Sequence, residues 1–346
     1  MMIVAQAPCR IDFAGSVTDV QPFCDHIEGV VVNAAVNRYV RCTYLPEPAD
    51  GFVVLDQINN DMLQVAGVDE MPAHGLPGRL KACLQTFPAL SGGTFLLQSD
   101  LRHGSGMASS SALLTCLVAA ITAALHQTLS PAATAEIAYQ IERHSLGLLC
   151  GRQDAYASVQ GGLSQFTFSQ DRVTRRPISL PPALAGNFLS GLYVAYTTVQ
   201  RSSDHLMRKM IEMLAAQDPL LLDVMTAHSD LARQAGLALA DGHLRRFGQL
   251  LNESQANQER LPIPVSPPQA RMLLQSARAA GAWGARLGGV GGGGYATLLL
   301  PLSQRQSIAR QLRAQGWALE PIAVDWMGLR VHVAPCTNHD AKTTHG

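Results

Sequence analysis

The sequence predicts a protein of two domains that mixes strands and helices. Its 346 residues are enough for two domains of ordinary size with a large core. A long β-branched run at residues 30–44 predicts a strand, and apolar residues at helical spacing in 113–125 predict a helix. A basic, proline-bearing stretch at 169–182 predicts the boundary, so we expect domains at 1–180 and 181–346.

The first half is expected to begin with a strand, a turn-rich loop and a second strand within residues 2–45. The loop covers residues 10–29 and is dense in Gly, Asp, Ser and Thr. Ser130 followed by Pro131 predicts a helix N-terminus, because serine caps free amides and proline fits the first helical position. The other elements expected here are strands at 52–56, 62–65 and 93–101, and helices at 80–87, 113–125 and from 130 to about 146.

The second half is expected to be richer in helix. It should open with a strand at 188–197, and a glycine run at 288–294 should precede a strand at 295–300. Helices are expected at 203–214, 218–240, 243–258, 267–280 and 302–315, and the last strands at 317–325 and 328–334.

Charge and composition exclude several classes of function. Lys+Arg and Asp+Glu are 26 each, so there is no electrostatic case for a nucleic-acid or acidic-membrane partner. Hydrophobic residues make up 47% and charged residues 15%, as in a compact soluble protein. The longest apolar stretch, within 112–125, is shorter than the roughly 20 residues that a membrane span needs.

The seven scattered cysteines include no C-x-x-C pair, so zinc and thioredoxin-like chemistry are unsupported. Together with a start that does not resemble a signal peptide, they favour a reducing cytoplasm. A homodimer is the default expectation for such a protein.

The strongest chemical signal is a loop of small residues between the strand at 93–101 and the apolar helix. Glycines allow close backbone approach, and free amides at a helix N-terminus attract phosphate. A glycine-rich cap before a core helix is the plainer alternative. The residues expected to hold a nucleotide are Gly104, Ser105, Gly106, Met107, Ala108, Ser109, Ser110 and Ser111.

Two familiar nucleotide motifs are excluded. No G-x-x-x-x-G-K-[ST] sequence is present, so this is not a Walker-type loop. Residues 289–294 formally contain G-x-G-x-x-G, but a strand-like run follows them where a dinucleotide site needs a helix. A dinucleotide-dependent oxidoreductase is therefore disfavoured.

Three segments in order resemble the motifs of the GHMP kinases, the superfamily of galactokinase, homoserine kinase and mevalonate kinase. They are residues 10–19 (RIDFAGSVTD), the loop 104–111 (GSGMASSS) and the late glycine run. With residues 151–157 (GRQDAYA), the motifs most resemble those of the bacterial D-glycero-D-manno-heptose 7-phosphate kinases. The likeness covers almost the whole chain.

The resemblance implies an α+β fold with a ribosomal-S5-like N-terminal domain and a ferredoxin-like C-terminal domain. It implies ATP and Mg²⁺ as cofactors and a sugar phosphate as substrate. The implied reaction phosphorylates the anomeric hydroxyl of D-glycero-D-manno-heptose 7-phosphate, for capsule or lipopolysaccharide precursors. The open alternatives are a fucokinase- or galactokinase-like enzyme and a sugar-sensing regulator without turnover.

The resemblance also assigns catalytic and metal-binding roles. Asp154 is expected to face the acceptor hydroxyl, with Arg10 beside it to favour ionisation. Glu142, with Ser109 or Ser110, is expected to hold Mg²⁺ against the phosphates. The plainer alternatives are a helix cap for Asp154, a surface arginine for Arg10 and a solvated helix carboxylate for Glu142.

The expected substrate contacts come from three segments of the chain. Asp19 resembles the residue that grips sugar hydroxyls in the family, and Arg201 is proposed to meet the sugar's own phosphate. The full set of expected contacts is Gly15, Thr18, Asp19, Arg201, Gly292 and Gly293.

Two departures from the family pattern bear on function. Ala108 stands where the family usually has glycine, and we expect it to need right-handed helical geometry and to tighten the loop. Ser16 and Val17 replace the Glu-His pair of galactokinase-like members, which argues against galactose as substrate.

Overall fold

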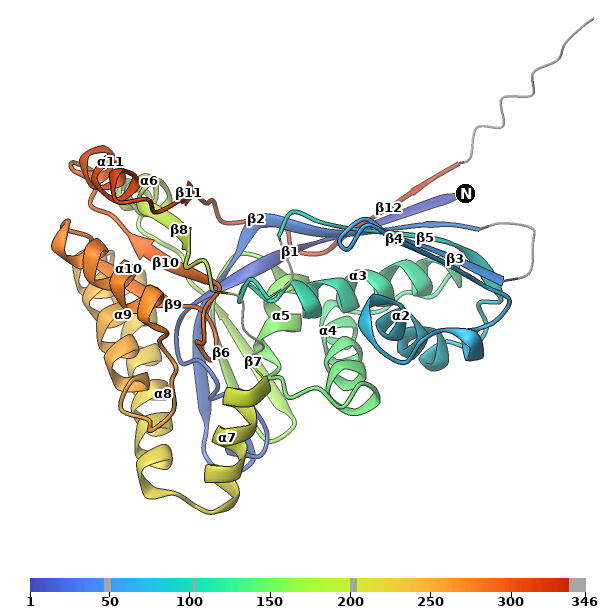
Figure 1. Ribbon diagram of the computed structural model, residues 1–346, viewed down its shortest axis with the longest axis horizontal. Helices are drawn as coiled ribbons and strands as arrows, with labels where there is room; N and C mark the ends of the chain where they lie inside the picture. The colour runs from blue at the N-terminus through green and yellow to red at the C-terminus, as the bar shows by residue number, and fades with distance from the viewer. Residues whose placement is uncertain (47–50, 102–103, 200–203, 336–346) are drawn as a thin grey trace, which may run out of the picture.

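The computed structural model describes residues 1–46, 51–101, 104–199 and 204–335. Within them the chain forms an eight-stranded and a four-stranded sheet (Figure 1). The strands are β1 (Met2–Ala14), β2 (Gly29–Leu45), β3 (Gly51–Asp56), β4 (Asp61–Val65), β5 (Gly92–Ser99), β6 (Leu163–Ser169), β7 (Arg172–Pro177), β8 (Leu192–Tyr196), β9 (Gly284–Leu287), β10 (Tyr295–Leu299), β11 (Leu319–Pro321) and β12 (Arg330–Ala334).

Helices carry most of the remaining described chain. They are α1 (Phe23–His26), α2 (Gly75–Thr86), α3 (Ser109–Ala124), α4 (Pro131–Gln140), α5 (Gln153–Gln160), α6 (Pro182–Gly191), α7 (Asp204–Ala215), α8 (Pro219–Ala240), α9 (Leu244–Gln258), α10 (Pro268–Ala279) and α11 (Arg305–Ala314). A 3₁₀ turn covers Val68–Glu70, and a π-helical turn, Ile141–Ser145, continues α4. No helix in these ranges is both long and apolar enough to cross a bilayer.

The large sheet is organised by β2, whose 17 residues serve two neighbours in succession. Its first part pairs with β6 and its second part with β5, while β1 runs antiparallel along most of its length. The strand order is β12-β1-β2-β5-β3-β4, with β6 and β7 branching from β2. The β3–β5 pair is parallel.

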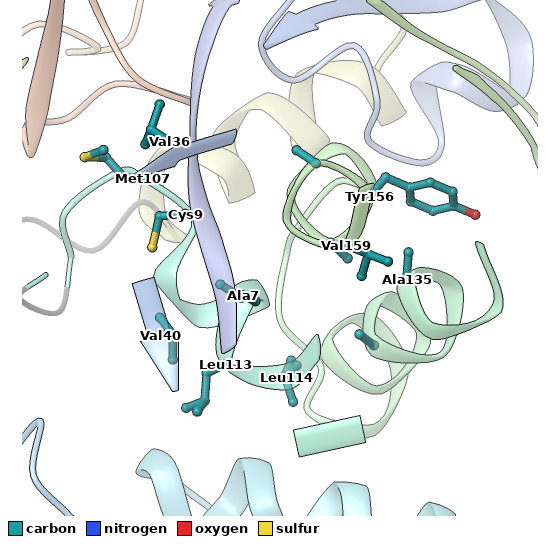
Figure 2. Close-up of a cluster of buried hydrophobic side chains, with 14 of the residues drawn as sticks. Ala7, Cys9, Val36, Val40, Met107, Leu113, Leu114, Ala135, Tyr156 and Val159 are labelled. Carbon is teal, nitrogen blue, oxygen red and sulfur yellow. The ribbon is translucent and has the colours of Figure 1, made fainter. Parts of the chain in front are cut away.

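Helices α2 to α5 gather on one face of this sheet, with α3 against β1 and β2 (Figure 1). Since α3 lies between the sheet and its neighbouring helices, it is apolar on nearly all sides, and Leu113, Leu114 and Leu117 are fully buried. Figure 2 shows Leu113 and Leu114 of α3 beneath Ala7 of β1. This packing fixes the start of α3 against β1.

The second half contributes the small sheet, in the order β11-β8-β10-β9. Helices α8 and α9 pack against β1 of the large sheet. Helix α9 also packs against β9 of the small sheet. Three fully buried rings tie the two halves together: the ring centroid of Phe13 lies 6.1 Å from Phe188 and 5.1 Å from Phe247.

The sequence located most elements correctly, including all four long helices between residues 204 and 279. The capped helix start at Ser130 is confirmed, because its Oγ accepts a hydrogen bond from the Ala133 amide at 3.2 Å. Two expectations were wrong. The loop expected at 10–29 begins only at Gly15, because β1 runs on to Ala14. The strand expected at 188–197 begins only at Leu192, because α6 occupies 182–191.

The last strand departs from a simple division of the chain. β12 pairs antiparallel with β1, with Ile3 opposite Val333, and so belongs to the large sheet. Domain limits at 1–180 and 181–346 therefore stay a proposal, and the final strand returns to the first half's sheet.

Candidate active site

A cavity of about 450 Å³ opens where the loop after β5 faces the late glycine run. Elements from both halves of the chain form its wall. Residues that line it include Arg10, Val17, Asp19, Arg79, Gly104, Ser105, Gly106, Ala108, Ser109, Ser110, Ser111, Glu142, Gln153, Asp154, Asp204, Met207, Gly288, Gly289, Val290 and Gly291.

The loop of residues 104–111, which we call the phosphate-type loop, is held between the two halves of the chain by backbone hydrogen bonds. The amide of Arg10 donates to the Met107 carbonyl at 3.0 Å, and the amide of Tyr295 donates to the Ser105 carbonyl at 2.9 Å. A side chain at Gly294, whose φ is +77°, would lie 2.4 Å from the Ser105 carbonyl oxygen. Glycine is needed there because the second half's backbone passes directly against the loop.

Helix α3 begins at Ser109, and no side chain caps its N-terminus. Its first amides and the positive end of the helix dipole therefore meet the cavity, an arrangement suited to a phosphate group. The expectation for Ala108 was wrong: its φ of 60° and ψ of 30° are left-handed helical values. The chain reverses sharply here to start α3, and alanine adopts the conformation that the family's glycine would adopt at lower cost.

Arg10 and Asp154 meet at the cavity wall. Nε and Nη2 of Arg10 lie 2.7 and 2.6 Å from the same oxygen, Oδ1 of Asp154, and Nη1 donates to the Gly106 carbonyl at 2.8 Å. No hydrogen bond among the described residues engages Oδ2 of Asp154. Burial raises the pKa of Asp154, while Arg10 opposes the rise. Asp154 is no helix cap: it lies in the first turn of α5 and faces the cavity.

Asp19 lies beside this pair on the loop after β1. Its carboxylate accepts hydrogen bonds from the Gln153 amide at 2.9 Å and from Gln153 Nε2 at 3.1 Å. Burial, reinforced by the nearby charge of Asp154, raises the pKa of Asp19 to about 6. The hydrogen bonds anchor Asp19 to the residue preceding Asp154, so the two carboxylates share one side of the cavity.

Glu142 lies in the π-helical turn after α4, opposite the start of α3. Its carboxylate accepts hydrogen bonds from Ser110 Oγ at 2.9 Å and Ser111 Oγ at 2.5 Å. Burial raises the pKa of Glu142, and the serine hydrogen bonds counteract part of the rise. A carboxylate with adjacent hydroxyls at a phosphate-type loop is an all-oxygen donor set that fits Mg²⁺ shared with phosphate oxygens. Ser109 and Ser110 both line the cavity.

Arg79 is a wall residue that the sequence does not predict. It projects from α2 and donates from Nε and Nη2 to Ser110 Oγ at 3.1 and 2.9 Å. The only signal was a cationic residue near the start of a helix expected at 80–87, and nothing in that pattern connects it with the loop 31 residues later.

Some expected contacts lie behind the wall. Thr18 is fully buried, and its hydroxyl donates to the carbonyls of Gly15 at 2.8 Å and Val30 at 3.1 Å, so it shapes the turn. Side chains added at Gly292 and Gly293 would strike Leu206 and the Val199 carbonyl. Gly15, Thr18, Met107, Gly292 and Gly293 are not among the lining residues. Arg201 lies outside the described residues.

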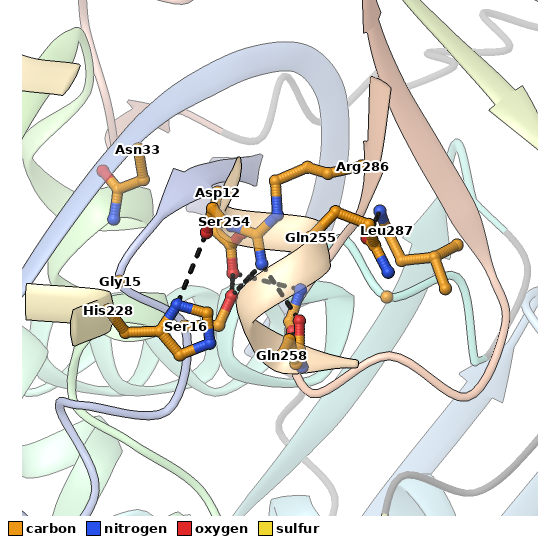
Figure 3. Close-up of polar contacts among 12 residues, drawn as sticks. Asp12, Gly15, Ser16, Asn33, His228, Ser254, Gln255, Gln258, Arg286 and Leu287 are labelled. Carbon is orange, nitrogen blue, oxygen red and sulfur yellow. Dashed lines mark hydrogen bonds and ion pairs between the residues drawn. The ribbon is translucent and has the colours of Figure 1, made fainter. Parts of the chain in front are cut away.

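Figure 3 shows a second arginine–carboxylate pair, formed by Arg286 and Asp12. Arg286 of β9 donates to Asp12 of β1 at 2.7 Å and to Ser16 at 2.6 Å, and both members of the pair are fully buried. The Gly289 amide donates to the other Asp12 oxygen at 3.0 Å. The pair therefore joins the first strand to the late glycine run.

Both halves of the chain match known domains. Residues 78–162, which contain the loop, Glu142 and Asp154, match the GHMP kinases N terminal domain, and residues 235–316 match the GHMP kinases C terminal domain. The chain belongs to the GHMP kinases. The α+β fold expected from the sequence is confirmed.

Individual GHMP kinases are similar over most of this chain. A D-glycero-alpha-D-manno-heptose 7-phosphate kinase of Campylobacter jejuni is 25% identical over 322 residues, covering 90% of this chain and 94% of that protein. A galactokinase of Roseiflexus sp. is 25% identical over 345 residues, covering 90% and 86%.

Solved GHMP kinase structures share the fold. A D-glycero-D-manno-heptose 1-phosphate kinase from Bacteriodes thetaiotaomicron superimposes with a TM-score of 0.78 at 22% identity, covering 96% of this chain and 99% of that one. A Lactococcus lactis galactokinase complexed with galactose gives a TM-score of 0.78 at 16% identity, covering 96% and 95%.

Proposed function

We propose that this ATP-dependent carbohydrate kinase phosphorylates the anomeric hydroxyl of D-glycero-D-manno-heptose 7-phosphate and yields the 1,7-bisphosphate. Such a product suits the supply of activated heptose for capsule or lipopolysaccharide. The similarity to a heptose 7-phosphate kinase over 90% of the chain supports the choice of sugar. A cytoplasmic location and a homodimer, both expected from the sequence, stay proposals.

The observation that carries the proposal is the position of Arg10. It binds Asp154 with two N–H groups and the Gly106 carbonyl with a third. One side chain thus sets the distance between the carboxylate and the phosphate-type loop. A sugar hydroxyl bound by Asp154 would then face a phosphoryl group held on the loop, and phosphoryl transfer depends on such positioning.

Each residue then has a chemical task. Asp154 orients the acceptor hydroxyl through Oδ2 and takes its proton, while Arg10 opposes the rise that burial causes in the pKa of this carboxyl. An anomeric hydroxyl is more acidic than an ordinary alcohol, so a carboxylate suffices as base. Asp19 offers acceptor oxygens to the ring hydroxyls of the sugar.

The start of α3 and Glu142 would hold the nucleotide end. The backbone amides of Ser109 to Ser111 would donate hydrogen bonds to phosphate oxygens, and Glu142 with Ser110 would hold Mg²⁺. When bound, ATP supplies the phosphoryl group and Mg²⁺ neutralises charge on its oxygens.

A galactokinase-like activity is the second candidate, favoured by the 25% identity to the Roseiflexus enzyme. The structure gives a reason to rank it lower. Ser16 is fully buried and engaged by Asp12 and Arg286, so it offers nothing to a sugar. The adjacent Val17 lines the cavity with an apolar side chain.

An ADP-release screen with ATP tests the proposal. The acceptors are D-glycero-D-manno-heptose 7-phosphate, the 1-phosphate named for the Bacteriodes structure, unphosphorylated heptose, galactose and fucose. We expect kcat/KM for the 7-phosphate to exceed that for every other sugar by at least about a hundred-fold. Such a ratio corresponds to a difference in activation free energy of two or more times the energy of one ordinary hydrogen bond. A higher value for galactose or fucose would overturn the choice of sugar, and no ADP release with any acceptor would favour a sensing role.

A further inference from the structure

Arg79 lies one turn into α2 and reaches the start of α3. Its Nη1 donates to the Gly75 carbonyl at 3.1 Å, which fixes the arm of the side chain. Its Nε and Nη2 both donate to Ser110 Oγ, and Ser110 in turn donates to Glu142. The three side chains form a continuous line from α2 to the π-helical turn, along one edge of the cavity.

The central hydroxyl of this line has a limited number of bonding positions. A serine hydroxyl donates one hydrogen bond and accepts through two lone pairs. The Ser110 hydroxyl donates its one hydrogen bond to Glu142, and the two N–H groups of Arg79 are directed at its lone pairs. A divalent cation bound to Ser110 would need a lone pair and would lie within a few ångströms of the guanidinium charge. Arg79 and a metal ion therefore compete for Ser110.

The charge of the wall indicates where a released guanidinium would go. Among the described lining residues, Asp19, Glu142, Asp154 and Asp204 are acidic, and Arg10 and Arg79 are basic. A metal–nucleoside triphosphate is itself negative, so it needs cations from the wall. Arg10 is bound to Asp154, whereas the Ser110 hydroxyl and the Gly75 carbonyl, the groups that Arg79 contacts, are neutral.

Resting on the nucleotide site proposed above, we propose that Arg79 is a phosphate-binding residue that exchanges Ser110 for the triphosphate. Its guanidinium holds Ser110 when no metal occupies that hydroxyl, and pairs with the terminal phosphate oxygens when metal and nucleotide bind. The planar fork of arginine matches two phosphate oxygens as well as it brackets one hydroxyl. Arg79 thereby links metal binding to recognition of the number of phosphates.

Direct binding measurements without sugar test this role. Arg79→Met removes the charge, and Arg79→Lys keeps it without the fork. Lys81→Met is the matched control: it removes a charge from the same helix, but Lys81 donates to the Asp69 and Met71 carbonyls and does not line the cavity. Calorimetry with Mg·ATP and AMP, and electron paramagnetic resonance with Mn²⁺ alone, give the affinities.

We expect Arg79→Met to weaken Mg·ATP binding about ten- to a hundred-fold, the range of a charge-assisted hydrogen bond. AMP binding should change less than about threefold, and Mn²⁺ alone should bind Arg79→Met more tightly than wild type because its competitor is gone. Arg79→Lys should lose less Mg·ATP affinity than Arg79→Met.

Two results would overturn the inference in distinguishable ways. Equal Mg·ATP affinities in Arg79→Met and Lys81→Met, with normal wild-type binding, would remove Arg79 from the phosphate site and leave the proposed kinase activity standing. A wild-type protein that binds no Mg·ATP would overturn the proposed function and the role of Arg79 together. If Arg79→Met does not fold, Arg79→Lys with wild-type affinity for both Mg·ATP and Mn²⁺ would also overturn it.

Discussion

Two arginine–carboxylate pairs lie side by side in this protein and differ in one respect. Arg10 and Asp12 are two residues apart on β1 and so project from the same face of the strand. Arg10 pairs with Asp154 at 2.6 Å, and Asp12 pairs with Arg286 at 2.7 Å. The side chain of Asp154 is 20% exposed, whereas Asp12 and Arg286 are 0% exposed.

The difference teaches that exposure, more than pairing, separates the carboxylate proposed to act in catalysis from the one that holds the fold. Both oxygens of Asp12 are engaged, by Arg286, Ser16 and the Gly289 amide, and Asp12 does not line the cavity, so no substrate reaches it. Asp154 keeps one oxygen directed to no described partner. Burial lowers the pKa of Arg286 and raises that of Asp154, and in each pair the partner opposes the change.

The largest effect should come from breaking the fully buried pair of Arg286 and Asp12. Arg286→Met leaves Asp12 charged and buried without its cation, and should reduce the free energy of unfolding by about 3–5 kcal/mol in urea denaturation. Arg246→Met removes a comparable but exposed pair with Glu253 and should cost less than about 1 kcal/mol. Equal losses in the two variants would show that the buried pair does not join the halves.

On the cavity side of the comparison, Asp19 should make the free energy of unfolding depend on pH. Its pKa is raised from 3.8 to about 6, so the folded state binds this proton more tightly than the unfolded state. Stability from this group is therefore fully present only below about pH 4 and is lost as pH rises through 6, by at most roughly 3 kcal/mol. The measurement is the free energy of unfolding of wild type minus that of Asp19→Asn, from pH 4 to 7.

A difference that is flat across this range, or that rises with pH, would contradict the assignment for Asp19. The Asp154→Asn background sharpens the test, because the charge of Asp154 contributes to the raised pKa of Asp19. In that background the midpoint should move to lower pH.

At the proposed metal-binding end, Glu142→Gln keeps the shape and one acceptor oxygen, but it replaces the other oxygen with an NH2 donor and removes the charge. The Mg²⁺ concentration for half-maximal turnover should rise about ten- to a hundred-fold, as when a metal site loses an important partner. Glu212→Gln, an exposed change on α7, is the control. An unchanged Mg²⁺ titration of Glu142→Gln would remove Glu142 from the metal site.

The smallest effect concerns Ala108 in the phosphate-type loop. Because Ala108 has a left-handed backbone, Ala108→Gly should raise the free energy of unfolding by up to about 1 kcal/mol. Ala123→Gly, near the end of α3, should lower it by about 0.5–1 kcal/mol. If Ala108→Gly destabilised the protein as Ala123→Gly does, the backbone at 108 would not be strained.

The sequence predicted the parts of this site that depend on local pattern. The phosphate-type loop, Glu142 and Asp154 belong to short motifs whose residue types indicate their chemistry. The structure brings all three to one cavity. Pairings across long separations left no such mark. Arg286 is 274 residues from Asp12, and nothing near either residue indicates its partner.

Two features of the fold were not predicted, for different reasons. β12 is a short strand whose pattern does not say which sheet it joins, and only its pairing with β1 places it in the large sheet. Helix α6 did carry a local signal, since Pro181 and Pro182 stand at its start, where proline is favoured. Its apolar run 188–191 was instead interpreted as strand because short apolar runs suit both.

The central claim is that of two similar ion pairs one serves catalysis and the other the fold, and Asp154→Asn beside Asp12→Asn tests it most directly. For each variant, turnover at saturating Mg·ATP and sugar and the free energy of unfolding are measured on the same preparation. Asp154→Asn should lose several hundred-fold or more in kcat, bind Mg·ATP as wild type does and unfold within about 1 kcal/mol of it, whereas Asp12→Asn should lose mainly stability. Near-wild-type turnover in Asp154→Asn, or a loss of turnover matched by a loss of stability, would contradict the account.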